Sequence, residues 1–206
     1  MENDDIKNME QSILEAAEKL FLDKGFSMTS TTEIAREAGC NQALVHYYYR
    51  TKDKLFEAIF ERKFRKFVEP FLNTIQSDLP FEKHLIYLIE SHFDLIKENP
   101  KVPFLLFNEL WINPSRLEPL RMKLALEHQA YFEKLDKELQ KEIKKGNYRN
   151  ISIIDLMMTI FSLNVTLFLA GQILQEMTKM DEDTYNAFLL HRKKENVLIV
   201  LNSLQA

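Results

Sequence analysis

The stretch from Thr29 to Leu55, TSTTEIAREAGCNQALVHYYYRTKDKL, constrains the fold more than any other part of the 206-residue chain. Ser30 precedes Glu33 by three residues, a spacing that lets each side chain bond a free backbone N–H in the first turn of a helix. Gly39 then permits a tight left-handed turn, and Asn41 repeats the capping chemistry for a second short helix. Two brief helices joined in this way predict a helix-turn-helix, whose second helix enters the DNA major groove.

Composition favours an all-α protein. With 46% hydrophobic residues the chain can bury a sizeable core, while four Gly and six Pro leave few of the turn signals that a many-stranded β protein needs. The single cysteine, Cys40, cannot form an internal disulfide and suits a reducing compartment. The N-terminal segment lacks an apolar run, so we expect no secretory signal and a cytoplasmic location.

Charge is distributed unevenly along the chain. The net charge of −4 argues against nonspecific coating of nucleic acid, so DNA affinity has to come from local charge placement. Between Arg36 and Lys66 the sequence holds eight basic residues and four acidic ones. This local surplus of positive charge adjoins the predicted helix-turn-helix.

Hydrophobic spacing and breaker residues predict about nine helical segments. Three of them cover the helix-turn-helix region, and a long fourth one begins after Lys52 and should kink or end at Pro70. The remaining segments are expected near residues 81–98, 102–111, 115–145, 156–174 and 184–204. No flexible linker separates these segments, so we expect the parts of the chain to be joined through the long helix.

The segment Leu156–Leu174 carries no charge and is close to the minimum length for a membrane helix. We reject a membrane span because the segment contains five polar residues, and a helix that is apolar all round can equally be buried on every side. The five are Thr159, Ser162, Asn164, Thr166 and Gln172. Ser162, Thr166 and Ala170 follow each other at four-residue steps and form a small-residue ridge where another helix could approach closely.

The region from about Ile13 to Ile59 resembles the DNA-binding region of TetR-type bacterial transcriptional regulators. The residues that carry the resemblance are Thr29-Ser30, Ile34-Ala35, Ala38-Gly39, the run His46-Tyr47-Tyr48-Tyr49, and Lys52 with Leu55. Three positions depart from the commonest pattern, namely Ala43, Leu44 and His46, and these departures bear on the operator sequence and leave the fold unchanged.

The resemblance implies an N-terminal helix-turn-helix domain at residues 1–52 and a C-terminal ligand-binding and dimerisation domain at residues 53–206. It also implies a homodimer formed through the last two helices, and two recognition helices placed in successive major grooves. The residues expected to contact DNA are Thr29, Ser30, Thr32, Asn41, Gln42, Ala43, Leu44, His46, Tyr47 and Lys52. Of these, Thr29, Ser30, Tyr47 and Lys52 are expected to hold phosphates, whereas Gln42 and Leu44 are expected to reach base edges.

Aromatic residues recur at helical spacing in the middle of the chain, and each of them by itself is expected to be an ordinary residue of the hydrophobic core. Taken together with the family resemblance and with polar residues on the same segments, they favour a mainly apolar ligand pocket with a few polar anchors. The residues expected to line it are His92, Phe93, Phe104, Phe107, Asn108, Trp111, Gln129, Phe161, Asn164 and Phe168.

Signals for catalysis and for metal binding are weak. The five histidines never take an i, i+4 spacing and no cysteine cluster accompanies them, so we expect no metal, no cofactor and no catalytic residue. The sequence therefore predicts a ligand-released repressor that binds a palindromic operator as a dimer. The alternative is a helical small-molecule or lipid-binding module whose DNA motif is vestigial.

Overall fold

The computed structural model describes residues 2–74, 79–112 and 114–205, and every regular element in these ranges is helical. The elements are α1 (Glu2–Lys24), α2 (Thr31–Glu37), α3 (Gln42–Tyr49), α4 (Lys52–Thr74), α5 (Phe81–Glu98), α6 (Lys101–Ile112), the 3₁₀ helix η1 (Pro114–Leu117), α7 (Glu118–Lys144), α8 (Ile153–Leu169), α9 (Gly171–Thr178) and α10 (Glu182–Ser203). The all-α prediction is confirmed. The helix α4 continues past Pro70, since a proline removes only one bond from a long helical ladder.

The chain divides into two compact units. The first unit comprises Met1–Lys66 and Phe104–Lys123, and the second unit comprises Phe67–Pro103 and Leu124–Ala206. The buried residues of the first unit include Leu55 and Phe56 of α4, so its core extends beyond residue 52. The predicted domain boundary after residue 52 stays a prediction.

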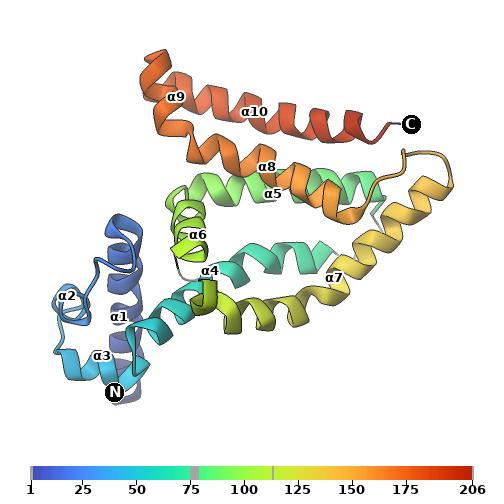
Figure 1. The fold of residues 1–206 in the computed structure, drawn as a ribbon. Helices are drawn as coiled ribbons and strands as arrows, with labels where there is room; N and C mark the ends of the chain where they lie inside the picture. The colour runs from blue at the N-terminus through green and yellow to red at the C-terminus, as the bar shows by residue number, and fades with distance from the viewer. Residues whose placement is uncertain (1, 75–78, 113, 206) are drawn as a thin grey trace. The chain divides into compact units, whose positions relative to one another are not determined.

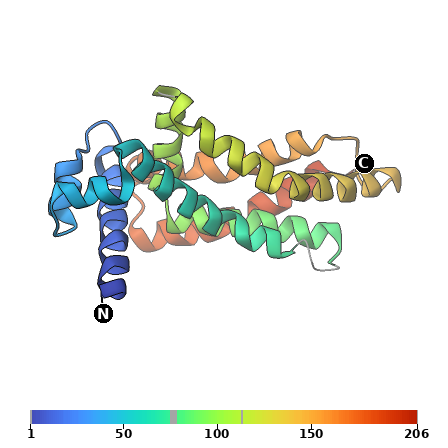
Figure 2. The ribbon, with the colours of Figure 1, turned by 90° about the horizontal axis from the view of Figure 1, so that it is seen from below.

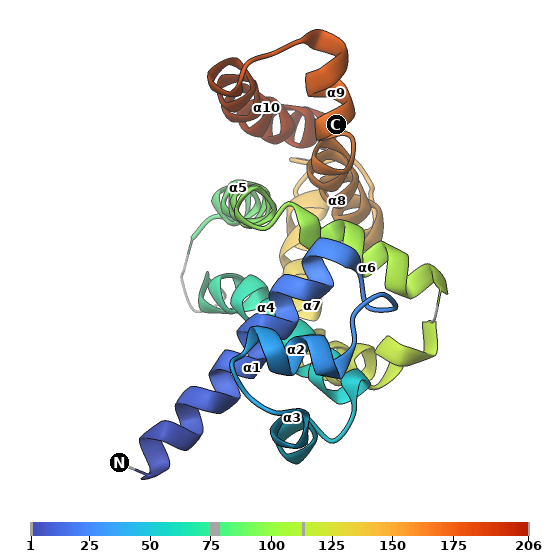
Figure 3. The ribbon, with the colours of Figure 1, turned by 90° about the vertical axis from the view of Figure 1, so that its left-hand side faces the viewer.

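Aromatic packing holds α1, the loop after it and α4 together in the first unit. The ring of Phe56 lies 5.3 Å from that of Phe21 and 5.2 Å from that of Phe26, both in edge-to-face geometry. Arg62 and Lys63 of α4 each reach the carboxylate of Glu18 on α1 at 2.6 Å. The short helices α2 and α3 lie beside the later turns of α1, whose first turns extend beyond them (Figures 2 and 3).

Three long helices, α5, α8 and α10, pack on one another in the second unit. They run side by side in Figure 1 and occupy the corners of a triangle when seen nearly along their axes in Figure 3. Their shared core includes Leu85 and Ile89 of α5, Leu156 and Ile160 of α8, and Val200 of α10.

The uncharged segment near residues 156–174 is two helices and not one. α8 ends at Leu169, and α9 begins at Gly171 with its axis bent by 54°. The glycine at the start of α9 has a packing reason, because the hydroxyl of Tyr185 on α10 lies only 2.2 Å from the place where a Cβ on Gly171 would be. The expected continuous helix is therefore wrong, and this division accounts for ten α-helices in the described residues where about nine were predicted. Among the described helices, none is by itself long and apolar enough to span a membrane, and only the bent pair α8 and α9 meets that test together.

Candidate DNA-binding site

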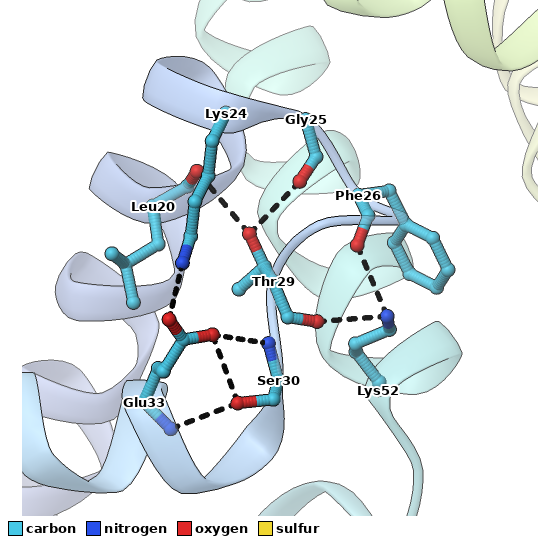
Figure 4. Close-up of polar contacts among 8 residues, drawn as sticks. All are labelled: Leu20, Lys24, Gly25, Phe26, Thr29, Ser30, Glu33 and Lys52. Carbon is cyan, nitrogen blue, oxygen red and sulfur yellow. Dashed lines mark hydrogen bonds and ion pairs between the residues drawn. The ribbon is translucent and has the colours of Figure 1, made fainter.

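The start of α2 is fixed by a reciprocal pair of capping bonds (Figure 4). The Ser30 hydroxyl accepts from the Glu33 backbone N–H at 3.2 Å, and the Glu33 carboxylate accepts from the Ser30 backbone N–H at 2.9 Å. Lys24, at the end of α1, donates to the other oxygen of this carboxylate at 2.5 Å. The Lys24 bond, together with the bonds from Ser30, lowers the pKa of Glu33 to about 2. The capping box predicted from spacing is confirmed.

The turn between α2 and α3 has the predicted geometry. Gly39 adopts a φ of +70°, in the left-handed region that a residue without a Cβ enters at little cost. The Asn41 side chain then accepts from the Leu44 backbone N–H at 3.0 Å and caps α3. Val45, 2% exposed, anchors one face of α3 in the core of the first unit. The opposite face is therefore held outward.

The outward face of α3 carries groups that can contact DNA. Gln42, Ala43, His46 and Tyr47 are exposed, with Tyr47 at 71%. Amide, imidazole and phenol groups can bond base edges or phosphates, and a methyl group can contact thymine. Leu44, expected to reach a base edge, is half-buried and so offers only part of its side chain to a partner outside the protein.

Tyr48 and Tyr49, which follow Tyr47, are half-buried. The Tyr49 hydroxyl donates to the backbone oxygen of Glu10 on α1 at 3.4 Å. Burial raises the pKa of Tyr49 to about 12. The Tyr48 ring lies edge-on to that of Tyr47, with ring centroids 5.2 Å apart. The Tyr49 bond thus joins the C-terminal end of α3 to α1.

A surface hollow of about 520 Å³ adjoins this face of α3. Its lining contains three basic side chains and several hydroxyl groups but no carboxylate, which suits an anionic partner. The lining residues are Ser27, Met28, Thr29, Ser30, Thr31, His46, Arg50, Thr51 and Lys52. Four of the ten residues that the sequence predicts to contact DNA thus line one concave surface, namely Thr29, Ser30, His46 and Lys52.

Thr29 and Lys52 differ from the expectation that their side chains hold phosphates. Thr29 is 2% exposed, and its hydroxyl donates inward to the backbone oxygens of Gly25 at 2.8 Å and Leu20 at 3.3 Å. The Lys52 ammonium donates to the backbone oxygens of Thr29 at 2.8 Å and Phe26 at 3.0 Å, and lies 4.1 Å from the centre of the Phe26 ring (Figure 4). The Thr29 side chain is therefore bonded to the end of α1, and the Lys52 side chain is bonded to the loop that leads into α2.

Replacing Lys52 with methionine tests this structural role. Methionine keeps an apolar stem near Phe26 but removes the donors to two carbonyl groups, so we expect the free energy of unfolding to fall by about 1–2 kcal/mol. The affinity for operator DNA should fall to the same extent for all sequences. The slope of the logarithm of the association constant against the logarithm of the salt concentration should stay unchanged. A direct phosphate contact would instead reduce that slope by about 0.9 per subunit. Urea unfolding and salt titration measure the two quantities.

Lys54 provides the matched control. It lies on the same turn of α4, its side chain is 60% exposed, and its ammonium pairs with Glu57 at 2.6 Å. Lys54→Met removes the same charge without touching the loop, so unfolding should change by less than about 0.5 kcal/mol. A salt slope that falls only in the Lys52 variant would assign the ammonium to a phosphate.

Comparisons with known proteins agree with this geometry. Residues 13–59 match the family model described as bacterial regulatory proteins, tetR family. These residues form the DNA-binding region of a TetR-type regulator. The chain is 24% identical over 137 residues to the fatty acid metabolism regulator protein of Bacillus subtilis, covering 66% of this chain and 69% of that relative.

Solved structures share the fold of this regulator over nearly its whole length. The transcriptional regulator FadR from Bacillus subtilis, in complex with stearoyl-CoA, superposes with a TM-score of 0.67 at 19% identity and covers 95% of this chain and 99% of that one. HlyIIR, a hemolysin II transcriptional regulator, superposes with a TM-score of 0.62 at 24% identity, covering 98% and 99%. The regulator is a DNA-binding transcription factor with an N-terminal helix-turn-helix and a helical C-terminal part.

The structure brings together half of the residues expected to bind a ligand. In the second unit, the ring of His92 stacks on Phe161 at 6.1 Å between centroids, and Phe93 lies edge-on to Phe168 at 5.1 Å. Asn164 donates to the backbone oxygen of Ile89 at 3.0 Å and lies 3.0 Å from Nδ1 of His92. His92 and Asn164 are therefore partners of each other, and their burial does not require a ligand.

Four of the other five expected ligand residues fall in the first unit and one falls on α7. Phe104, Phe107, Asn108 and Trp111 belong to the first unit, and Trp111 is 90% exposed. Gln129 is exposed and donates to Glu133 one turn further along α7, at 2.9 Å. The sequence placed these residues in a pocket because they follow a helical period, but a period does not show which side of a helix faces inward. The lining of a ligand pocket stays a prediction.

Sequence reasoning missed the partner of Gln42. The Gln42 amide nitrogen donates to the Thr31 hydroxyl at 2.9 Å, and the amide oxygen accepts from the Thr32 hydroxyl at 3.3 Å. Thr32 was expected to contact DNA, whereas Thr31 was not singled out at all. These bonds cross the turn between α2 and α3, and no spacing rule relates residues eleven positions apart on different helices.

Proposed function

We propose that this regulator is a repressor that binds a palindromic operator as a homodimer and leaves the operator when an elongated, mainly apolar ligand binds. The observation that carries the proposal is the outward face of α3, where Gln42, His46 and Tyr47 stand exposed on a helix whose other face is anchored by Val45. In this proposal Ser30 and Tyr47 contact phosphates, and Thr29 and Lys52 hold the loop that presents Ser30. Gln42 reads a base edge.

Exposed apolar side chains on α8 and α10 support the homodimer. On α8, Ile154 and Met158 are 72% and 56% exposed, and the small residues Ser162 and Thr166 continue the same stripe at four-residue steps. On α10, Leu190 and Leu198 are 54% and 51% exposed. Contiguous apolar side chains of this kind are typical of a protein interface, and small residues let helix axes approach closely. A dimer formed through these stripes would contain two recognition helices, one from each protomer.

The ligand class in this proposal comes from the second unit and from a structural neighbour. The FadR structure that shares the fold holds stearoyl-CoA. The second unit of this chain places four aromatic rings, those of His92, Phe93, Phe161 and Phe168, on α5 and α8. We therefore propose a long-chain acyl group as the apolar part of the ligand. Stearoyl-CoA is the first compound to test for release of the operator, with free CoA as its control.

Selection of operators from random DNA tests the function, and Met158→Glu tests the assembly. We expect the wild type to enrich a palindrome with half-sites about 34–36 Å apart, or a multiple of that distance. A carboxylate at position 158 repels its symmetry mate, so the variant should sediment as a monomer. Its operator affinity should fall by about a hundredfold, because the second half-site no longer adds to binding. Electrophoretic mobility shifts and sedimentation measure both quantities.

Tyr87→Glu is the matched control for this variant. Tyr87 lies on α5 and is 41% exposed, so the substitution adds the same charge to the second unit away from the two stripes. The control should stay dimeric and bind the operator as the wild type does. A wild-type monomer that binds its operator tightly would contradict the dimer, and a wild type that enriches no sequence would indicate a vestigial DNA motif.

A further inference from the structure

Gln42 lies at the start of the recognition helix, yet its side chain is already bonded to the protein. Its amide nitrogen donates to the Thr31 hydroxyl at 2.9 Å, and its amide oxygen accepts from the Thr32 hydroxyl at 3.3 Å. Both threonines lie in the first turn of α2. The amide therefore has a fixed orientation, with one hydrogen and one lone pair directed at α2.

His46, one turn further along α3, accounts for the second amide hydrogen. Its Nδ1 lies 3.1 Å from the backbone oxygen of Arg50. A carbonyl oxygen only accepts, so in the neutral imidazole the ring hydrogen lies on Nδ1 and Nε2 is a bare acceptor. This Nε2 lies 3.4 Å from the Gln42 amide nitrogen. The tautomer set by Arg50 therefore matches a donor from Gln42.

The remaining hydrogen-bonding capacity of Gln42 follows by counting. A glutamine amide has two hydrogens and two lone pairs, and here both hydrogens and one lone pair have partners in the protein. What remains for a base is one lone pair on the amide oxygen. A glutamine that recognises adenine through two bonds needs a hydrogen free for N7 as well as an oxygen free for the amino group at N6.

We propose that Gln42 reads its base pair through the amide oxygen alone, with Thr31 and His46 as positioning residues that hold the amide hydrogens. Such an acceptor recognises a base that presents an amino group in the major groove, so cytosine and adenine satisfy it equally, and guanine and thymine do not. The inference rests on the proposed function, because it requires α3 to lie in the major groove of an operator. In this arrangement Gln42 accepts one hydrogen bond from a base amino group and does not form the two hydrogen bonds by which a glutamine recognises adenine.

Binding of the full-length protein to a panel of operators tests the inference. The panel carries each of the four bases in turn at every position of the selected half-site. At one position, cytosine and adenine should bind within about twofold of each other and about tenfold more tightly than guanine or thymine. Thr31→Val frees an amide hydrogen, so adenine should gain about fivefold over cytosine there. Thr31→Ser keeps the hydroxyl and should retain the wild-type profile.

Gln42→Glu gives a second test that does not depend on Thr31. A carboxylate only accepts, so the variant should keep the preference for cytosine and adenine over guanine and thymine, while overall affinity falls through charge repulsion. A wild type that prefers adenine to cytosine by more than about tenfold would overturn the inference, since that preference needs the second bond. An unchanged profile in Thr31→Val would overturn it as well. If the wild type selects no operator at all, the proposed function fails first, and the two failures are thereby distinguished.

Discussion

Asn164→Leu should lower the free energy of unfolding by about 4 kcal/mol, because it removes three hydrogen bonds between buried groups at roughly 1–1.5 kcal/mol each. Asn164 is fully buried on α8 and belongs to a chain of hydrogen bonds that we call the buried polar network, formed by Arg192, Asn196, Asn164 and His92. Few single substitutions on a helical surface approach this size.

The buried polar network joins three helices. Arg192 donates to the Asn196 amide oxygen at 2.8 Å, and the Asn196 amide nitrogen donates to the Asn164 amide oxygen at 2.9 Å. Asn164 in turn directs its nitrogen at Nδ1 of His92, 3.0 Å away on α5. Leucine at position 164 would leave the Asn196 nitrogen with one longer bond, to the backbone oxygen of Leu163 at 3.3 Å, and would remove the donor that faces His92.

Urea unfolding at one protein concentration measures the effect, since assembly would otherwise change the apparent stability. Asn186→Leu is the control, because Asn186 is an exposed residue of α10 and the same substitution there should change unfolding by less than about 0.5 kcal/mol. The triple variant His92→Phe, Asn164→Leu and Asn196→Leu should lose less than the sum of its parts, because replacing both members of a pair removes the unsatisfied groups. Strict additivity, or a harmless Asn164→Leu, would show that the network contributes little.

Local chemistry made the helix-turn-helix predictable from sequence. The capping box at Ser30, the left-handed Gly39 and the cap at Asn41 each depend on residues no more than three positions apart, so spacing alone fixes their geometry. The helix predicted near residues 81–98 was found at Phe81–Glu98 for the same reason, since Pro80 and Asn99 delimit it locally.

Features that depend on tertiary contacts were beyond the reach of sequence patterns. The need for a glycine at position 171 follows from the close approach of Tyr185, which is fourteen residues away in sequence. The bonds of Lys52 to the loop at Phe26 and Thr29 span more than twenty residues. In both cases the group that decides the role of the residue is distant in the sequence.

The polar residues near the expected pocket illustrate the same limit. The sequence showed correctly that His92 and Asn164 would need partners if buried, and it assigned those partners to a ligand. The structure supplies the partners from within the chain, and Asn196, the residue that completes the set, was not considered because it lies on the last helix. A buried amide predicts a hydrogen-bond partner but does not identify it.

Lowering the pH from 7 to 4 should reduce the free energy of unfolding by about 3 kcal/mol through His92 alone. Burial lowers the pKa of His92 from 6.5 to about 4, because a charged imidazole is poorly solvated between α5 and α8. A protonated Nδ1 would also direct a hydrogen at the amide nitrogen of Asn164, where the neutral ring accepts. The bond from Asn164 therefore depends on the neutral ring.

The direction of the stability change and its pH range follow from the pKa values of His92 in the unfolded and the folded chain. Between pH 6.5 and pH 4 the unfolded chain binds a proton at His92 that the folded chain does not, so acid favours unfolding and stability is lost as the pH falls through this window. Each unit of pKa difference corresponds to about 1.36 kcal/mol. The two pKa values differ by 2.5 (6.5 less 4), and most of the corresponding free energy of unfolding is lost by pH 4. Above pH 6.5 both states are neutral at this site and the effect vanishes.

His92→Asn isolates the contribution of this one group. An asparagine oxygen can take the place of Nδ1 as the acceptor for Asn164 but does not titrate, so the variant should lose about 3 kcal/mol less than the wild type between pH 7 and pH 4. Chemical unfolding at several pH values, run in parallel on both proteins, removes the contribution of all other groups from the comparison. Parallel curves would mean that His92 becomes protonated in the folded state without penalty. A wild-type curve that falls toward that of His92→Asn as the pH is lowered would link the acid sensitivity to the bonds that hold α5, α8 and α10 together. Two of these helices, α8 and α10, carry the exposed stripes that are proposed to form the dimer.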